Sequence, residues 1–352
     1  MAKIISGIQQ IGVGIPNVHE AWAWYRKNFG MDVPVFEEAA VADLMLPYTG
    51  GQSHERHAIL ALNMQGGGGF EIWQYTSRTP EAPKFEIGVG DLGIYAGKIK
   101  SKDIERSFSE MSESGSVISP KIETQIDGKK MFYVKDPYNN IFQIVESDNW
   151  FKSTSASTGG AAGAILGVTS IDRSIAFYSS ILGYDTVLAD ENGEFEDLKV
   201  LHGGEGRFRR VILGHSKPRV GAFSRLLGSS EIELIQALDR PAKKIFENRY
   251  WGDLGFIHLC FDIHHMQDLK EECERAGHQF TVDSSNSFDM GEAAGHFSYV
   301  EDPDGTLIEF VETHKVPILK KIGWYLDLRK RDPEKSLPNW MLSALGLNRK
   351  KD

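Results

Sequence analysis

One histidine in a strand-like stretch gives the first indication of chemistry. His258 lies in residues 252–263, where apolar and polar residues alternate as in a half-buried strand. The same Gly-Asp-Leu-Gly opening begins an earlier stretch at Gly90, but there Ala96 takes the place of the histidine. A lone strand histidine is usually an ordinary core or surface residue. The difference between two otherwise similar stretches is what singles out His258.

Other strand positions also differ between the two copies of this internal repeat. At the first, fourth and eighth strands in turn, the paired residues are Gln10 and Gly163, Glu71 and Glu233, and Gln143 and Glu309. Ala96 and Gly163 carry no donor atom. The remaining polar side chains collect in the front half of the first copy and the back half of the second: Gln10, Glu71, His258 and Glu309.

This set of side chains suits a metal ion. One neutral amide oxygen, two carboxylates and one imidazole fit a hard to borderline divalent ion in octahedral geometry, with two positions left for water or substrate. The two carboxylates would cancel the charge of the ion. If instead each copy closed on itself, the two groups would be Glu233, His258 and Glu309 in one, and Gln10, Glu71 and Gln143 in the other.

Strand and helix signals recur along the chain in the same order. Residues 4–15 alternate as in a strand, and the N-cap signal of Asn17 with the C-cap signal of Gly30 predicts a helix between them. The same strand, turn and helix recur at 165–183, and Asp-Pro turns join the last two strands of each copy. Each copy therefore has two βαβββ halves, which makes four in the chain.

The repeat divides the chain into segments. We expect a first module at residues 1–147, a Ser-, Thr- and Gly-rich connector at 148–163, a second module at 164–313 and a basic extension at 314–352. The extension holds ten Lys or Arg and four Asp or Glu. The spacing of its apolar residues predicts a terminal helix, and these residues are Ile318, Leu319, Ile322, Tyr325 and Leu326. The basic side of this helix is solvated or docks on the acidic body. The alternative is that the helix covers a dimer interface or the mouth of a pocket.

Several short motifs together resemble one family. They are the helix segments ending in Ala-Trp-Tyr at 23–25 and Ala-Phe-Tyr at 176–178, the Leu-Gly-Tyr step at 182–184, and the Asp-Pro-Asp-Gly-Thr-Leu-Ile-Glu-Phe segment at 302–310. The chain resembles, over residues 4–312, the vicinal oxygen chelate superfamily, which includes glyoxalase I, bleomycin resistance proteins and the extradiol dioxygenases. The resemblance implies an α+β fold of tandem modules, in which four βαβββ units form open, barrel-like mixed sheets.

The resemblance also implies a site and an activity. Family members hold one divalent metal ion, and in this chain Zn, Ni, Co, Mn and Fe are all possible. The positions that match the family's metal ligands are Gln10, Glu71, His258 and Glu309. The ion would chelate two neighbouring oxygens of a small substrate and stabilise an enediolate, with Glu309 or Glu71 as the catalytic base. We therefore expect a glyoxalase-like lyase or isomerase. The alternatives are a non-catalytic, resistance-type binding protein and, third, a dioxygenase.

Two departures from the family bear on the substrate. Glyoxalase I enzymes that use glutathione carry an arginine where this chain has Gly14 and an asparagine where it has Tyr75. Both normally contact glutathione, so we expect a different substrate. A dioxygenase iron site needs two histidines and a glutamate within one module, and Gly163 removes the first of those histidines.

Composition limits the remaining classes. The formal net charge of −10 disfavours nucleic-acid binding, and no run approaches the roughly 18 apolar residues that a membrane span needs. The two cysteines, Cys260 and Cys273, do not form a C-x-x-C pair. We expect a cytoplasmic monomer or homodimer whose partner is a small molecule.

Overall fold

The chain folds into four βαβββ units, in the order that the repeat predicts. The computed structural model describes residues 2–285, 288–290, 293–319 and 324–350. The first two units consist of β1 (Ile4–Gly14), α1 (Val18–Phe29), β2 (Val33–Val41), β3 (Glu55–Leu62) and β4 (Gly69–Tyr75), followed by β5 (Gly93–Ser101), α2 (Ile104–Glu113), β6 (Glu123–Thr124), β7 (Lys130–Lys135) and β8 (Ile141–Glu146). The last two consist of β9 (Thr158–Gly167), α3 (Ile171–Leu182), β10 (Thr186–Gly193), β11 (Phe208–Gly214) and β12 (Glu231–Ala237), followed by β13 (Gly255–His264), α5 (Met266–Arg275), β14 (Phe280–Asp283), β15 (Phe288–Met290), β16 (Ala293–Glu301) and β17 (Leu307–Thr313). Three short elements lie between strands: η1 (Asp43–Tyr48), η2 (Glu196–Leu198) and α4 (Ser224–Leu227).

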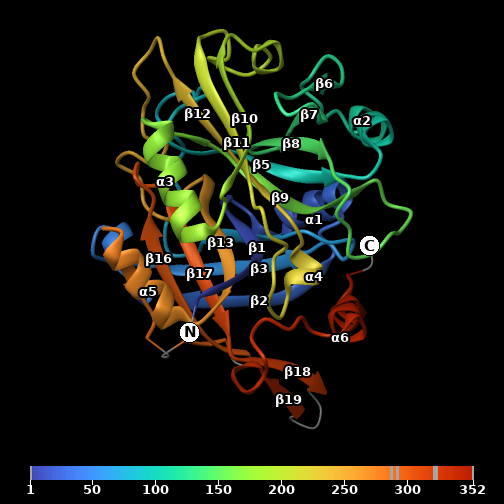
Figure 1. Cartoon of the computed structure of the whole chain (residues 1–352), viewed down its shortest axis with the longest axis vertical. Helices are drawn as coiled ribbons and strands as arrows, with labels where there is room; N and C mark the ends of the chain where they lie inside the picture. The colour runs from blue at the N-terminus through green and yellow to red at the C-terminus, as the bar shows by residue number, and fades with distance from the viewer. Residues whose placement is uncertain (1, 286–287, 291–292, 320–323, 351–352) are drawn as a thin grey trace.

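Each of the two large sheets combines one unit from either copy. The first sheet has the strand order β14-β16-β17-β13-β1-β4-β3-β2, and the second has β10-β11-β12-β9-β5-β8-β7-β6. In Figure 1 the blue strands β1 to β3 lie beside the orange and red strands β13 and β17, which are distant in sequence. Parallel and antiparallel pairs occur in the same sheet, since β1 pairs in parallel with β4 and antiparallel with β13. The predicted α+β fold with barrel-like mixed sheets is confirmed.

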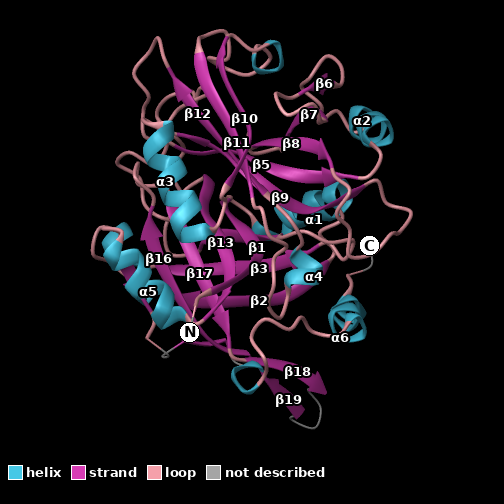
Figure 2. Cartoon of the chain, in the orientation of Figure 1, coloured by secondary structure: helices cyan, strands magenta, loops and turns pink. Residues whose placement is uncertain are grey.

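Helices α1 and α3 begin and end where their capping residues predict. Asn17 accepts hydrogen bonds from the first turn of α1, and Gly30 ends that helix in the left-handed conformation, with φ of 61°. Gly183 ends α3 in the same way. The helices lie at the periphery of the sheets (Figure 2). None of the described helices combines the length and apolar character needed to span a membrane.

A buried tyrosine on a helix ties neighbouring units of each copy together. The Tyr25 hydroxyl of α1 donates to Asp136 Oδ2 in the turn before β8, at 2.6 Å. The Tyr178 hydroxyl of α3 donates in the same way to Asp302 Oδ2 before β17, at 2.9 Å. These bonds explain why a tyrosine follows the aromatic residue in both helix motifs and why both turns begin with aspartate.

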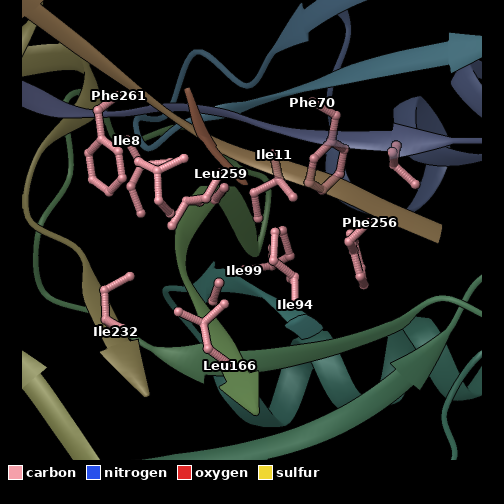
Figure 3. Packing of buried hydrophobic residues seen from close by; sticks show 14 of the residues in the cluster. Ile8, Ile11, Phe70, Ile94, Ile99, Leu166, Ile232, Phe256, Leu259 and Phe261 are labelled. Atoms are coloured by element: carbon pink, nitrogen blue, oxygen red, sulfur yellow. The ribbon is translucent and has the colours of Figure 1, made fainter. Parts of the chain in front are cut away.

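The main apolar core lies between the two sheets (Figure 3). Figure 3 shows side chains of β1, β4 and β13 on one side and of β5, β9 and β12 on the other, namely Ile8, Ile11, Phe70, Phe256, Leu259 and Phe261 against Ile94, Ile99, Leu166 and Ile232. All of these side chains are buried. Because both sheets contribute to one core, the strands that carry the site residues are held rigidly.

The connector and the extension differ from the expectations. Strand β9 begins at Thr158, so the last six residues of the expected connector, 158–163, are buried strand. The predicted helix in the extension is wrong, because β18 (Lys315–Leu319) and β19 (Trp324–Asp327) form a two-stranded hairpin. The β-branched Val316 and Ile318 favour an extended backbone, which the pairing with β19 stabilises. Ile322 lies outside the described residues.

The end of the extension packs on the first unit. Leu337 and Leu342 are buried in a cluster with Leu62 of β3, and Leu342 belongs to α6 (Asn339–Ala344). Arg349 pairs with Asp32 at 3.0 Å. This part of the extension therefore docks on the body.

Candidate metal centre

Four adjacent strands of the first sheet bring the expected ligand positions together. β1 lies between β4 and β13, and β13 pairs with β17. Gln10 on β1 and Glu309 on β17 share the register partner Cys260 on β13. Glu71 on β4 and His258 on β13 share the register partner Gly12 on β1, two residues after Gln10 and therefore on the same face of the sheet. The four side chains are buried, with exposed fractions of 4%, 9%, 0% and 7% for Gln10, Glu71, His258 and Glu309.

The side-chain ends converge on one point. His258 Nε2 lies 3.3 Å from Glu71 Oε2 and 3.1 Å from Glu309 Oε2. Gln10 Nε2 lies 3.4 Å from the same two oxygens. Adjacent ligand atoms of an octahedral ion with bonds of about 2.1 Å are roughly 3 Å apart. The spacing of the four side chains therefore fits the edges of such a coordination shell.

The amide of Gln10 also fits a ligand role. Gln10 Oε1 is buried and has no hydrogen-bond partner in the described part of the chain. The oxygen and nitrogen of an amide exchange places by a simple rotation about the last side-chain bond. That rotation would turn Oε1 toward the two carboxylates, where only a cation makes an acceptor favourable. In the orientation observed, Gln10 Nε2 donates to both carboxylates, and the unpartnered Oε1 leaves the side chain able to act as a metal ligand after rotation.

The electrostatics favour a cation at the same point. Burial alone would lower the pKa of His258, but the carboxylates of Glu309 and Glu71 outweigh it and raise that pKa to about 10. Burial raises the pKa of Glu309, yet His258 and the bonds from Tyr299 and Cys260 bring it below its ordinary value. Two buried carboxylates thus produce a negative potential that a divalent ion would neutralise.

A missing side chain makes room for the imidazole. Gly12 is the register partner of both Glu71 and His258. A Cβ at Gly12 would lie 2.4 Å from His258 Cε1 and 2.6 Å from its Nε2. Any other residue at position 12 would therefore displace the ring from the two carboxylates.

Aromatic side chains that sequence reasoning missed surround the site. Tyr299 on β16 is the register partner of Glu309, and its ring lies 5.6 Å from that of His258 at a steep angle. Trp251 lies parallel to the His258 ring at 6.3 Å and edge-on to Trp73 at 4.8 Å. The alternation along the last hairpin could have identified Tyr299, because Tyr299 and Glu309 face each other across its turn. Nothing in the sequence pattern could have placed Trp251, which precedes β13 in an irregular segment.

Both departures from glutathione-using enzymes have a structural cause. A Cβ at Gly14 would lie 2.1 Å from the Asp253 carbonyl oxygen, so the segment before β13 occupies the space that an arginine would need. Tyr75 packs edge-on against Trp73 at 4.5 Å, and its hydroxyl donates to the Trp251 carbonyl. The same segment is held in place by Arg78, which pairs with the Asp253 carboxylate.

The corresponding place in the second sheet is filled by ion pairs. Lys98, the register partner of Gly163 and Gln143, has its ammonium 2.7 Å from Glu233. Arg210 lies 2.6 Å from the other oxygen of Glu233. The side chains of this group are fully buried, namely those of Lys98, Gln143, Arg210 and Glu233. Two fixed positive charges therefore lie beside Glu233. The two alternative ligand groups, each drawn from a single copy, are not assembled, because Glu233 and Gln143 lie in a different sheet from His258 and Gln10.

Two long segments of the chain match one family model. Residues 7–144 and 161–310 match the family described as the Glyoxalase/Bleomycin resistance protein/Dioxygenase superfamily. The chain belongs to this superfamily. The resemblance that the sequence motifs indicated is thereby confirmed.

Solved structures agree with this superfamily fold. Glyoxalase I from Zea mays superposes with a TM-score of 0.53 at 14% identity, covering 88% of this chain and 92% of that one. A point mutant of the same enzyme gives 0.54 at 16% identity, with coverage of 88% and 92%. A candidate dioxygenase from Bacillus subtilis gives 0.52 at 14% identity, with coverage of 88% and 86%. No curated protein sequence matches the chain. At these identities the likeness concerns the fold.

Proposed function

We propose that this superfamily member is a metal-dependent lyase or isomerase of the glyoxalase type. Its substrate is a small molecule with two neighbouring oxygens. The observation that carries the proposal is the convergence of Gln10, Glu71, His258 and Glu309 from four adjacent strands at spacings of 3.1 to 3.4 Å. An amide, an imidazole and two carboxylates form a donor set that leaves positions open for substrate oxygens.

The four side chains would hold one divalent ion. When bound, such an ion supplies Lewis-acid polarisation of a substrate carbonyl. Zn, Ni, Co, Mn and Fe all accept this donor set. The paired carboxylates keep the site neutral overall, so that a neutral or singly charged substrate can enter without an extra electrostatic cost.

Glu309 and Glu71 are the groups that move a proton. Each carboxylate lies within 3.3 Å of His258 Nε2, so both would adjoin a substrate held at the ion. Removal of a proton from a carbon next to a carbonyl is the step that either could perform. His258, and after it the Tyr299 hydroxyl, lower the pKa of Glu309 and so favour the ionised carboxylate, ready to accept the proton.

The surroundings favour a compact substrate with an apolar or aromatic part. Trp251 and Tyr299 flank the imidazole, Trp73 packs edge-on against Trp251, and all three side chains are buried. The space that glutathione would need is occupied at Gly14 and Tyr75. Glutathione adducts are therefore poor candidates.

The cellular setting follows from the thiols. Cys260 and Cys273 are both free and buried. We place the chain in a reducing compartment, the cytoplasm, as a monomer or homodimer acting on small molecules.

A solvent-exchange experiment tests the activity. The metal-loaded chain is mixed in D₂O with a panel of small 2-hydroxycarbonyl and 2-oxoaldehyde compounds, and deuterium entry next to the carbonyl is followed by proton NMR. We expect exchange or conversion with at least one compound, and none with the Glu309→Gln variant. Tight metal binding without any exchange would favour the alternative, a ligand-binding protein on the same scaffold. Oxygen consumption on adding a catechol would instead favour a dioxygenase.

A further inference from the structure

Two histidines and a glutamate meet on the outer face of the first unit. His57 Nε2 of β3 lies 3.4 Å from Glu37 Oε1 of β2, and His19 Nε2 of α1 lies 3.7 Å from the same oxygen. The two imidazole rings are edge to face at 5.2 Å. One nitrogen of each ring and one carboxylate oxygen therefore lie within 4.8 Å of one another.

The fold fixes these three groups relative to one another. Glu37 is a diagonal neighbour of His57 in the β2–β3 ladder, so their side chains share a face. The first turn of α1 is anchored to the same face, because the Val18 amide donates to Gln74 Oε1 of β4 at 2.9 Å. Gln74 is in turn the register partner of His57. His19 follows Val18 directly and is thereby held beside the two strand residues.

This cluster is separate from the buried centre. Glu71 and Gln74 are three residues apart on β4, so their side chains point to opposite faces of the sheet. The cluster is also open to solvent, with side-chain exposures of 61% for His19, 40% for Glu37 and 26% for His57. An ion in solution could reach it without any movement of the chain.

At the corresponding position in the second copy, a side-chain cation replaces the histidine cluster. There, Arg209 of β11 places its guanidinium between Asp190 of β10, at 2.8 and 3.0 Å, and Asp172 of α3, at 2.8 Å. The helix is anchored in the same way, since the Ile171 amide donates to Gln236 Oε1 of β12. The repeat thus brings a helix residue and two strand residues together twice.

The two copies differ in the source of positive charge. In the second, the Arg209 guanidinium supplies it between the carboxylates of Asp172 and Asp190. In the first copy, His19 takes the helix position that Asp172 has in the second, and His57 takes the strand position that Arg209 has. Two imidazole nitrogens and a carboxylate oxygen also form a donor set for a divalent transition-metal ion.

We propose that His19, Glu37 and His57 bind a divalent transition-metal ion at the surface of the first unit. Two imidazoles and one carboxylate select borderline ions such as Zn²⁺, Co²⁺ or Ni²⁺ over Mg²⁺ or Ca²⁺. Water completes the coordination. A bound ion joins α1 to β2 and β3 as Arg209 joins α3 to β10 and β11, and it therefore stabilises the first unit.

Zinc titration of the full chain tests this site. The His258→Ala variant removes a ligand of the buried centre, so Zn²⁺ binding that persists in it reports on the surface cluster. We expect calorimetry to show one Zn²⁺ bound per chain in this background and a rise in melting temperature on adding Zn²⁺. Adding His57→Ala, and separately His19→Ala, should abolish both effects.

The matched control replaces another exposed histidine. His202 pairs with Glu86 alone at 3.4 Å, so His202→Ala in the same background should leave Zn²⁺ binding and the melting shift unchanged. The proposal is overturned if His19→Ala and His57→Ala bind Zn²⁺ as the background does, or if the background binds none. Neither result bears on the buried centre, which is measured in the wild-type chain.

Discussion

Gly12 and His258 face each other across β1 and β13, and the absence of a Cβ on Gly12 is what allows the imidazole to reach the two glutamates. A Cβ would lie 2.4 Å from the ring. The glycine therefore belongs to the site although it offers no donor atom.

Replacing Gly12 by alanine should disrupt metal binding. The added methyl group displaces the His258 ring, at a cost in stability of about 1–3 kcal/mol. We expect Gly12→Ala to lose most of its bound metal, measured by elemental analysis of the purified protein. The control is Gly193→Ala at the end of β10, where a Cβ meets nothing within 4 Å. Full metal content in Gly12→Ala would contradict the proposed ligand geometry.

The Tyr299 hydroxyl should affect catalysis without affecting metal content. Tyr299 faces Glu309 in the β16–β17 ladder, and its hydroxyl contributes to the lowered pKa of that carboxyl. Tyr299→Phe should retain the ion of the buried centre and lower the rate of solvent exchange by about 10²-fold. Tyr133→Phe is the matched control, because Tyr133 holds the same register position opposite Gln143 in the second sheet. Equal rates for wild type and Tyr299→Phe would remove the hydroxyl from the mechanism.

The ion pairs of the second sheet should be structural. Glu233 pairs with both Lys98 and Arg210 in a fully buried position, and Asp197 supplies a second negative charge at 2.8 Å from Arg210. Glu233→Gln should therefore destabilise the fold by about 3–5 kcal/mol while leaving metal content unchanged. Glu196→Gln, in an exposed pair with Lys199, should change stability little. Denaturant unfolding measures both, and a loss of metal in Glu233→Gln would show that the wrong cavity had been assigned.

The same carboxylate gives a pH dependence. Burial raises the pKa of Glu233, but Arg210 and Lys98 outweigh it and lower that pKa to about 2. A pKa lower in the folded state contributes stability above the unfolded value of about 4.3 and loses it as the pH falls. The difference in stability between wild type and Glu233→Gln should thus be full at neutral pH and narrow between about pH 4 and pH 2. A difference that stays constant over that range would contradict the ionised state of Glu233.

Asp262 should have the opposite dependence. Burial raises the pKa of this β13 carboxyl to about 7. The folded state therefore favours the protonated form, and stability is lost as the pH rises from about 4 through 7. Asp262→Asn should stabilise the chain at pH 8 and change little near pH 4, followed by thermal unfolding at both values. Asp148→Asn, at an exposed position, is the control. A variant less stable than wild type at pH 8 would show that ionised Asp262 is well compensated.

Sequence reasoning succeeded where the two copies could be compared. The βαβββ order, the caps at Asn17 and Gly30, and the grouping of Gln10 with His258 all followed from positions that repeat or fail to repeat. The comparison is informative because register in a half-buried sheet is fixed by the side-chain alternation.

The features that the sequence did not predict depend on contacts between segments that have no shared sequence pattern. Trp251 reaches the site from an irregular segment, and Gly12 matters only through the residue that it faces. In the extension, apolar spacing suggested a helix, but pairing of β18 with β19 prevailed. For the ion pairs around Glu233, Lys98 and Arg210 gave no sequence signal, since charged strand residues usually face solvent.

The central claim is that Gln10, Glu71, His258 and Glu309 hold one divalent ion between units that come from opposite ends of the chain. A metal-edge anomalous difference map from a crystal of the protein as purified tests it most directly. We expect a peak within bonding distance of these four side chains and none beside Glu233. A peak beside Glu233, or an ion held without Gln10 and His258, would contradict it.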